Sequence, residues 1–181
     1  MTPYPSSRLT QVVEWHGRQL CMRPIAPRDG VVHRAFFAAL RPAMSRVVTL
    51  TRLEGLASGD IAALARPATD RDHAFIATIE DESAPDEPLG VVRAATDPGN
   101  DTAEFVLLLG EQAKGRGLGR LLFGKLVDRC RQAGTRRLVG EAANEDEQLI
   151  ELARAFDFEI HCSHVVGILR LTLELQAAPR H

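Results

Sequence analysis

A turn with three glycines, set between an apolar strand pattern and a long helical pattern, most constrains how this chain folds. The strand pattern covers Ala103–Leu109, and the glycines that follow it are Gly115, Gly117 and Gly119. From Leu118 to about Ala133, apolar residues recur at helical spacing with charged residues between them. Such a turn lets consecutive backbone N–H groups face an anion at the positive end of a helix dipole. We therefore predict a phosphate-binding turn held on a packed helix.

Two better-known phosphate-binding motifs fit this spacing poorly. A P-loop needs Gly-x-x-x-x-Gly-Lys followed by Ser or Thr, but Arg116 and a further glycine follow Gly110 and Gly115. A dinucleotide-binding fingerprint would find its acidic residue in Glu141, but its third glycine position is Arg120. That fingerprint also opens a parallel sheet, whereas strands with hairpin connections precede the turn here.

The other patterns predict a mixed α+β fold, with a sheet covered by helices on both sides. Further strand patterns cover Gln19–Ile25, His73–Glu80, Leu89–Ala95, Arg137–Glu141, Phe158–Cys162 and Val165–Leu175. Further helical patterns cover about Gly30–Leu40, Leu53–Leu64 and Glu145–Ala155. The turn-forming segments Asp81–Glu87 and Asp97–Asn100 read as hairpin connections. We expect six to seven mostly antiparallel strands and about four helices.

Length and charge limit the class of protein. The 181 residues suit one domain, which we assign to residues 11–176, with a frayed segment at 1–10 and a tail at 177–181. Lys and Arg total 22 against 24 Asp and Glu, so no overall basic field favours nucleic acid or a membrane surface. No secretory signal and no apolar run of about 20 residues stand out. Three widely spaced cysteines fit reduced thiols, which points to the cytoplasm.

The order of these features resembles the GNAT superfamily of acyl-CoA N-acyltransferases. The superfamily's pyrophosphate signature is Gln or Arg, two residues, Gly, one residue, and Gly or Ala, and it falls on Lys114, Gly117 and Gly119. The similarity extends from about Leu20 to Leu175. In the segments MRPIAPRDG, RRLVGEAANED and LRLTLEL, the chain is similar to the acetyltransferase domain of bacterial Pat-type protein lysine acetyltransferases.

The chain departs from the family pattern at two places. Lys114 replaces the usual Gln or Arg, which keeps a cation but loses the fork geometry of Arg. The Gly-Phe pair that usually follows the second helix is Asp157-Phe158, so we expect a locally different turn there.

The resemblance implies acetyl-CoA as the cosubstrate and no metal. It places the pantetheine along the strand that ends at Leu109, with a bulge that splays this fourth predicted strand from the fifth. It also places the pyrophosphate on the glycine turn. The cofactor-binding residues so implied are Leu107, Leu108, Leu109, Lys114, Gly115, Arg116, Gly117, Leu118, Gly119, Arg120 and Asn144.

The resemblance also implies direct attack of an amine on the thioester, with an oxyanion stabilised by a backbone N–H near Leu108. An amine with a pKa of ~10.4 is mostly protonated at pH 7, so a general base is needed. Glu104 is our candidate, because strand alternation places it on one face with Val106 and Leu108. Pat-type enzymes have a glutamate on the corresponding strand.

Several assignments stay open at this level. Many family members protonate the leaving thiolate with a tyrosine, but the matching residue is Ala153, so a non-catalytic acyl-CoA sensor is the alternative function. Asn144 with Glu147 reads as a helix cap as well as a pantetheine contact. His161 and His164 are three positions apart, which places them on opposite faces of a strand, so we do not expect them to bind a metal together. The acceptor is either a small-molecule amine or a protein lysine, acted on by a monomer or a homodimer.

Overall fold

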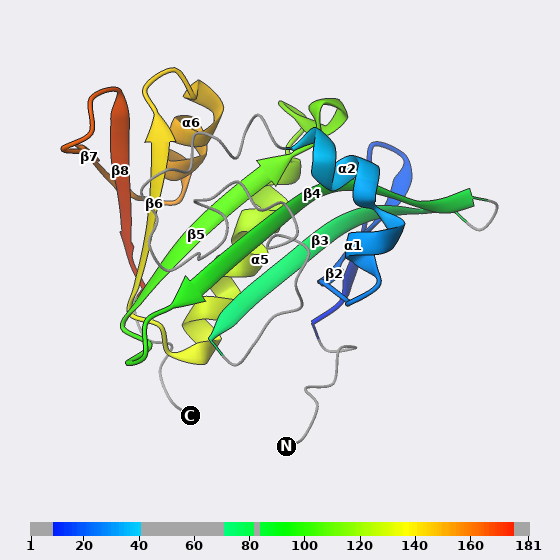
Figure 1. Ribbon diagram of the computed structural model, residues 1–181, viewed down its shortest axis with the longest axis horizontal. Coiled ribbons are helices and arrows are strands. Elements are labelled where there is room, and N and C mark those ends of the chain that lie inside the picture. The colour runs from blue at the N-terminus through cyan, green and yellow to red at the C-terminus, as the bar shows by residue number, and fades with distance from the viewer. Residues whose placement is uncertain (1–8, 41–70, 82–83, 176–181) are drawn as a thin grey trace.

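A single mixed sheet organises the protein (Figure 1). The computed structural model describes residues 9–40, 71–81 and 84–175, and the predicted helix over Leu53–Leu64 lies outside them. The strands are β1 (Gln11–Trp15), β2 (Arg18–Pro24), β3 (Asp72–Asp81), β4 (Ala84–Thr96), β5 (Thr102–Leu109), β6 (Arg137–Ala143), β7 (Glu159–Cys162) and β8 (Ile168–Glu174). Their order across the sheet is β1-β2-β3-β4-β5-β6-β8-β7. All neighbouring pairs are antiparallel except β5 and β6.

The predicted fold class is confirmed, but the predicted strand count is too low. The eighth strand is β1, which pairs with β2 through a tight hairpin at His16 and Gly17. Both turn residues have positive φ, at 50° and 75°. Because β1 is mostly exposed, it lacks the apolar periodicity by which the other strands are recognised.

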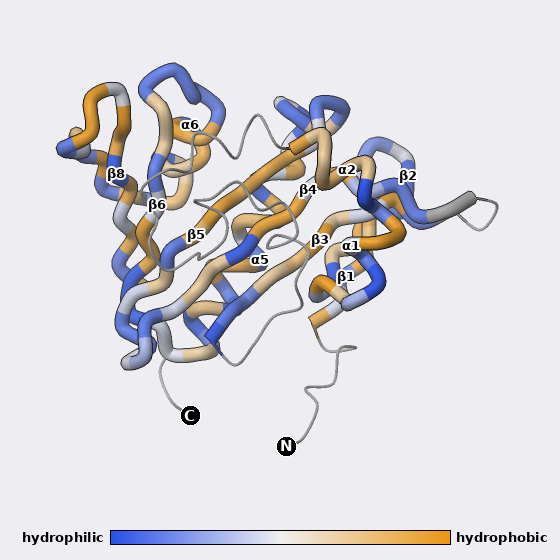
Figure 2. Tube along the Cα trace, viewed as in Figure 1, coloured by the Kyte–Doolittle hydropathy of each residue, from blue (hydrophilic) through white to orange (hydrophobic). Residues whose placement is uncertain are grey.

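The helices that the structure describes lie on both faces of the sheet. The described helices are α1 (Asp29–Val32), α2 (Arg34–Ala39), the 3₁₀ turn η2 (Glu111–Ala113), α5 (Leu118–Ala133) and α6 (Glu147–Ala155). Helix α5 lies across one face, and the core beneath it includes Phe105, Phe123 and Phe158. Helix α2 lies on the opposite face, where Phe37 packs with Val106 and Leu108. Figure 2 shows hydrophobic residues along the central strands between these layers.

The helix predicted over Gly30–Leu40 is two short helices that meet at His33. His33 has φ −106° and ψ 27°, which interrupts the helical backbone. Its ring Nε2 lies 3.7 Å from the carboxylate of Asp29, which is fully buried. Arg23 donates two hydrogen bonds of 2.8 Å to the same carboxylate. This group fastens α1 to the end of β2.

The start of α6 differs from the prediction. The N-cap is Asp146, whose side chain accepts a hydrogen bond of 3.1 Å from the Leu149 N–H. The predicted cap, Asn144, lies two residues earlier in the turn after β6, where its N–H donates to the Gly167 carbonyl at 3.0 Å. The capping prediction for Asn144 and Glu147 is therefore wrong, because β6 runs two residues further than expected before the chain turns.

The end of α6 keeps its turn without the expected glycine. Asp157 has φ 60°, the left-handed conformation that a glycine supplies at most helix ends. Its N–H bonds to the Arg154 carbonyl, and Phe158 then enters the core. Aspartate tolerates this conformation better than most residues, so the departure from the family pattern leaves the geometry intact. Among the described helices, none is long and apolar enough to span a membrane.

Candidate functional site

The glycine turn ends in the N-terminus of α5. Gly117 is the N-cap in a left-handed conformation with φ 83°, and Gly115 has φ 67°. The first intrahelical bond runs from the Leu121 N–H to the Gly117 carbonyl, so the N–H groups of the preceding residues are left for a ligand. A Cβ at Gly117 would meet no atom within 4 Å, so open space lies over these groups. This geometry fits a pyrophosphate.

Gly119 serves packing rather than conformation. It lies in the first turn of α5, and a Cβ there would lie 3.4 Å from the Leu109 side chain and 3.6 Å from that of Leu107. The neighbouring Leu118 side chain is fully buried, so only its backbone faces the turn. The small residue at Gly119 thus lets the helix start approach the end of β5 closely.

Two of the three basic side chains of the turn, those of Lys114 and Arg116, contact other protein groups. Lys114 forms an ion pair with Glu111, and both are exposed. Arg116 lies over the ring of Trp15 at 5.3 Å and donates to the Gln112 carbonyl at 3.4 Å. Arg120 is exposed at the start of α5. Lys114 and Arg120 therefore lie at the rim of the turn, while Arg116 is drawn against the β1–β2 hairpin.

That hairpin supports the glycine turn through contacts that were not predicted from the sequence. Trp15 Nε1 donates a 3.0 Å hydrogen bond to the Arg116 carbonyl, and His16 Nε2 lies 3.1 Å from the same oxygen. The residues are about 100 positions apart in the chain. The signal that was available is the pair of turn residues His16-Gly17 after the chain's only tryptophan.

The strands β5 and β6 part beside Glu104. Their parallel pairing ends at Glu104 and Val139, although β5 continues to Leu109 and β6 to Ala143 (Figure 1). Within the described residues, no strand pairs with this edge of β5 beyond Glu104. The predicted splay between the fourth and fifth strands is confirmed. Because it leaves backbone groups of Leu107 to Leu109 at a free edge, it suits the amides of a pantetheine arm.

The bulge predicted in β5 is absent. Its register against β4 runs without a shift from Gly90 and Leu109 to Thr96 and Ala103. Register shifts occur instead between β3 and β4, at Ala77/Thr78 and at Ile79/Asp81. The splay therefore arises from the divergence of β6 and not from an inserted residue in β5.

Glu104 is buried at the point where the strands part, with 6 % of its surface exposed. By alternation it shares its face with Val106 and Leu108, opposite α5, as predicted. Glu141 on β6 lies on the same face, because its neighbours Gly140 and Ala142 point into the α5 core. Burial raises the pKa of Glu141, and the nearby Glu104 raises it further, against the opposing effects of Arg170 and His164.

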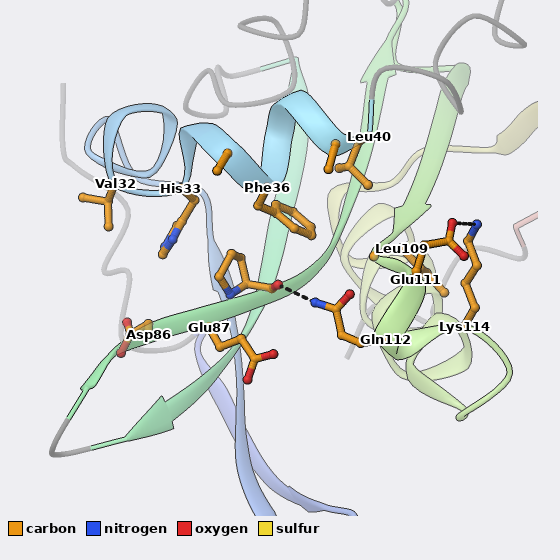
Figure 3. Close-up of a pocket in the computed structure, with 14 residues that line it drawn as sticks. Val32, His33, Phe36, Leu40, Asp86, Glu87, Leu109, Glu111, Gln112 and Lys114 are labelled. Atoms are coloured by element: carbon orange, nitrogen blue, oxygen red, sulfur yellow. Dashed lines mark hydrogen bonds and ion pairs between the residues drawn. The ribbon is translucent and has the colours of Figure 1, made fainter.

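A cavity of about 710 Å³ lies at the other end of β5 (Figure 3). Leu109, Gly110 and Lys114 line it on one side, and Phe36 of α2 and Leu40 just after that helix line it on the other. Figure 3 also shows the Glu111–Lys114 ion pair at its edge. Five residues of strand separate Leu109 from Glu104, a span of about 17 Å. The cavity and the predicted base therefore lie at opposite ends of one strand.

The remaining predicted residues are dispersed. Asn144 is exposed in the turn after β6. His161 is exposed on β7, and His164 follows in the next turn. No group of three or more metal-ligating side chains occurs among the residues that the structure describes. The predicted site thus consists of the glycine turn, the open edge of β5 and Glu104, and the structure adds the carboxylate of Glu141 on the same face.

Comparison with known proteins decides the family. The sequence profile of the acetyltransferase (GNAT) family matches residues 45–158, well over half of the chain. The chain belongs to the GNAT acetyltransferase family. This confirms the family predicted from the glycine turn, and with it an enzyme of the acyl-CoA-dependent acetyltransferase class.

Solved structures share the fold of this GNAT domain at low sequence identity. The GNAT domain of PAT from S. lividans has a TM-score of 0.73 at 20% identity, covering 95% of this chain and 99% of that one. RimL, a ribosomal L7/L12 α-N-protein acetyltransferase in complex with coenzyme A, has a TM-score of 0.64 at 14% identity, covering 93% and 100%. The structure of yncA from Salmonella typhimurium with acetyl-CoA has a TM-score of 0.60 at 17% identity, covering 89% and 96%.

Proposed function

We propose that this GNAT domain transfers an acetyl group from acetyl-CoA to a primary amine, either on a small molecule or on a protein lysine. The observation that carries the proposal is the start of α5, where Gly117 leaves backbone N–H groups facing open space. A helix start of this kind binds phosphate through its N–H groups and its dipole. RimL and yncA, which share the fold, were solved with coenzyme A and acetyl-CoA respectively.

The cosubstrate would be held along the length of β5. The pyrophosphate contacts the backbone from Gly117 to Arg120, with Lys114 supplying charge at the rim. The pantetheine amides pair with backbone groups of Leu107 and Leu109, which lie on the unpaired edge of the strand. Asn144 contacts the arm from the β6 side of the gap. The thioester then lies toward Glu104, at the closed end of the splay.

The chemistry needs one base and one anion-stabilising donor. Glu104 takes a proton from the ammonium form of the acceptor, which leaves a neutral amine with a free electron pair. That pair forms the C–N bond at the thioester carbonyl, and a backbone N–H on the open edge of β5, between Leu108 and Glu104, stabilises the oxyanion. The C–S bond then breaks, the thiolate of coenzyme A takes the second proton from nitrogen, and Glu104 releases the first to solvent.

The general acid of many family members has no counterpart here. Ala153, at the matching position, is buried in the α5 core with 3 % of its surface exposed. A thiolate whose thiol has a pKa near ~8.5 leaves without a dedicated acid, with the proton supplied by the amine or by water. We propose that the reaction takes place in the cytoplasm, which the three free cysteines suit.

The test is acetyl-CoA-dependent release of coenzyme A with a panel of primary amines and lysine-containing proteins. We expect release with at least one acceptor, and a loss of 10²–10⁴-fold in kcat for Glu104→Gln at unchanged acetyl-CoA affinity. Glu159→Gln, an exposed glutamate on β7, is the control and should retain full activity. Binding of acetyl-CoA without release by any acceptor would instead identify an acyl-CoA sensor. Unchanged rates in Glu104→Gln would remove Glu104 as the base.

A further inference from the structure

Glu141 carries a buried carboxylate oxygen that nothing satisfies. Its Oε2 is inaccessible to solvent and has no hydrogen-bond partner. Arg170 stands directly opposite on β8, but no ion pair joins the two within the described chain, and Arg170 is exposed. A buried acceptor without a donor costs stability, and a charged one costs more. An unpartnered group of this kind therefore calls for a ligand or another functional reason.

The position of Glu141 relates it to the proposed base. Glu104 pairs with Val139, so Glu141 lies two residues further along β6 and projects from the same face of the sheet. The parallel pairing of β5 and β6 ends at Glu104 and Val139, so the two strands are no longer paired where Glu141 lies. Burial raises the pKa of Glu141, Arg170 and His164 lower it, and Glu104 raises it. Two acidic groups on one face of the sheet favour the binding of a cation beside them.

From this geometry we infer that Glu141 binds the acceptor, accepting a hydrogen bond from its ammonium group and holding it beside Glu104. The inference rests on the proposed function and gives its substrate class: an acceptor that arrives as a primary ammonium. An ammonium has three N–H donors, enough for both carboxylates at once. Glu104 removes one proton, while Glu141 keeps the nitrogen within reach of the thioester. Glu141 thus acts on binding and orientation, and the proton transfer stays with Glu104.

Two independent readouts follow for Glu141→Gln. Loss of a charge-assisted hydrogen bond should raise KM for the amine by about 10- to 100-fold with acetyl-CoA affinity unchanged. Removal of a buried carboxylate oxygen that has no hydrogen-bond partner should also raise Tm, by about 2–4 °C. A residue with a purely structural role would lower Tm on substitution. Glu141→Asp keeps the charge on a shorter side chain and should restore part of the affinity for the amine.

The experiment measures amine KM, kcat, acetyl-CoA Kd and Tm for wild type, Glu141→Gln, Glu141→Asp and Glu104→Gln. Glu151→Gln, exposed on α6 across the sheet, is the matched control and should not change any of them. An unchanged KM in Glu141→Gln, while Glu104→Gln is inactive, overturns the inference and leaves the proposed function standing. A fall in Tm, or weaker acetyl-CoA binding, overturns it as well. If the wild type shows no amine-dependent activity, the proposed function itself fails.

Discussion

The brace between the β1–β2 hairpin and the glycine turn makes a quantitative prediction for Trp15→Phe. The substitution keeps a buried ring but removes the Nε1–H bond to the Arg116 carbonyl, at 3.0 Å. It also weakens the cation–π contact with the Arg116 guanidinium, 5.3 Å from the ring. The hydrogen bond contributes ~0.5–1.5 kcal/mol net and the cation–π contact ~0.5–1 kcal/mol.

The loss will fall toward the lower end of these ranges, because His16 Nε2 remains 3.1 Å from the same carbonyl oxygen. We therefore expect a loss of about 1 kcal/mol in the ordering of the turn. If the turn must be ordered to bind a pyrophosphate, this loss raises the Kd for acetyl-CoA about fivefold. The effect should appear in affinity and not in kcat at saturating substrate.

Isothermal titration with acetyl-CoA measures this effect directly. Val13→Ala is the control, since it truncates a partly buried residue of the same strand away from the turn. Since Trp15 is the only tryptophan, its fluorescence in the wild type should also change on titration. Equal Kd values for Trp15→Phe and wild type would refute the brace. An equal weakening in Val13→Ala would refute it too, by tracing the effect to general stability.

Two further predictions concern stability. A Cβ at Gly140 would overlap the Phe105 ring, which cannot move freely because its centroid lies 4.9 Å from that of Phe123. Gly140→Ala should therefore lower the free energy of unfolding by ~1–3 kcal/mol and lower Tm by several degrees. Gly124→Ala, which meets only Phe156 at 3.7 Å, is the calorimetric control, and equal Tm values in the two variants would contradict this account. Burial and the nearby Arg129 lower the pKa of His73 to about 4, whereas the same histidine in the unfolded chain has a pKa near 6.5. The unfolded chain therefore binds the proton first, and the free energy of unfolding falls as the pH drops from 6.5 to 4. Denaturant unfolding at pH 7 and pH 5 should show a smaller loss for His73→Asn than for wild type, and parallel losses would rule His73 out.

The parts of the fold that depend on local sequence were predictable. The strand over 103–109, the left-handed glycines and the helix to Ala133 lie close together in the chain. Their spacing predicts the conformation of the turn and indicates the family. The same holds for the hairpin at Asp97–Asn100, where the Asn100 N–H bonds to the Asp97 carbonyl at 3.0 Å. In each case turn chemistry and periodicity agree, so tertiary contacts had little left to decide.

What escaped prediction depends on residues far apart in the chain. The contact of Trp15 with Arg116 joins a short exposed hairpin to a turn about 100 residues later, and neither segment signals the other. Glu141 ends a strand pattern like any other polar residue, and only the parallel pairing of β5 and β6 sets it beside Glu104. The cap at Asp146 was missed for a smaller reason, since acceptor side chains at both 144 and 146 satisfy the same sequence rule.

The most direct test of a pyrophosphate site at the start of α5 is acetyl-CoA binding by variants of Gly117. Gly117→Ala and Gly117→Glu impose the same backbone strain at φ 83°, but only glutamate extends a negative charge into the space proposed for the pyrophosphate. We predict that wild type binds acetyl-CoA, that Gly117→Ala binds it more weakly, and that Gly117→Glu is weaker than Gly117→Ala by about tenfold or more. Equal affinities of the two variants would contradict a pyrophosphate site at the start of α5.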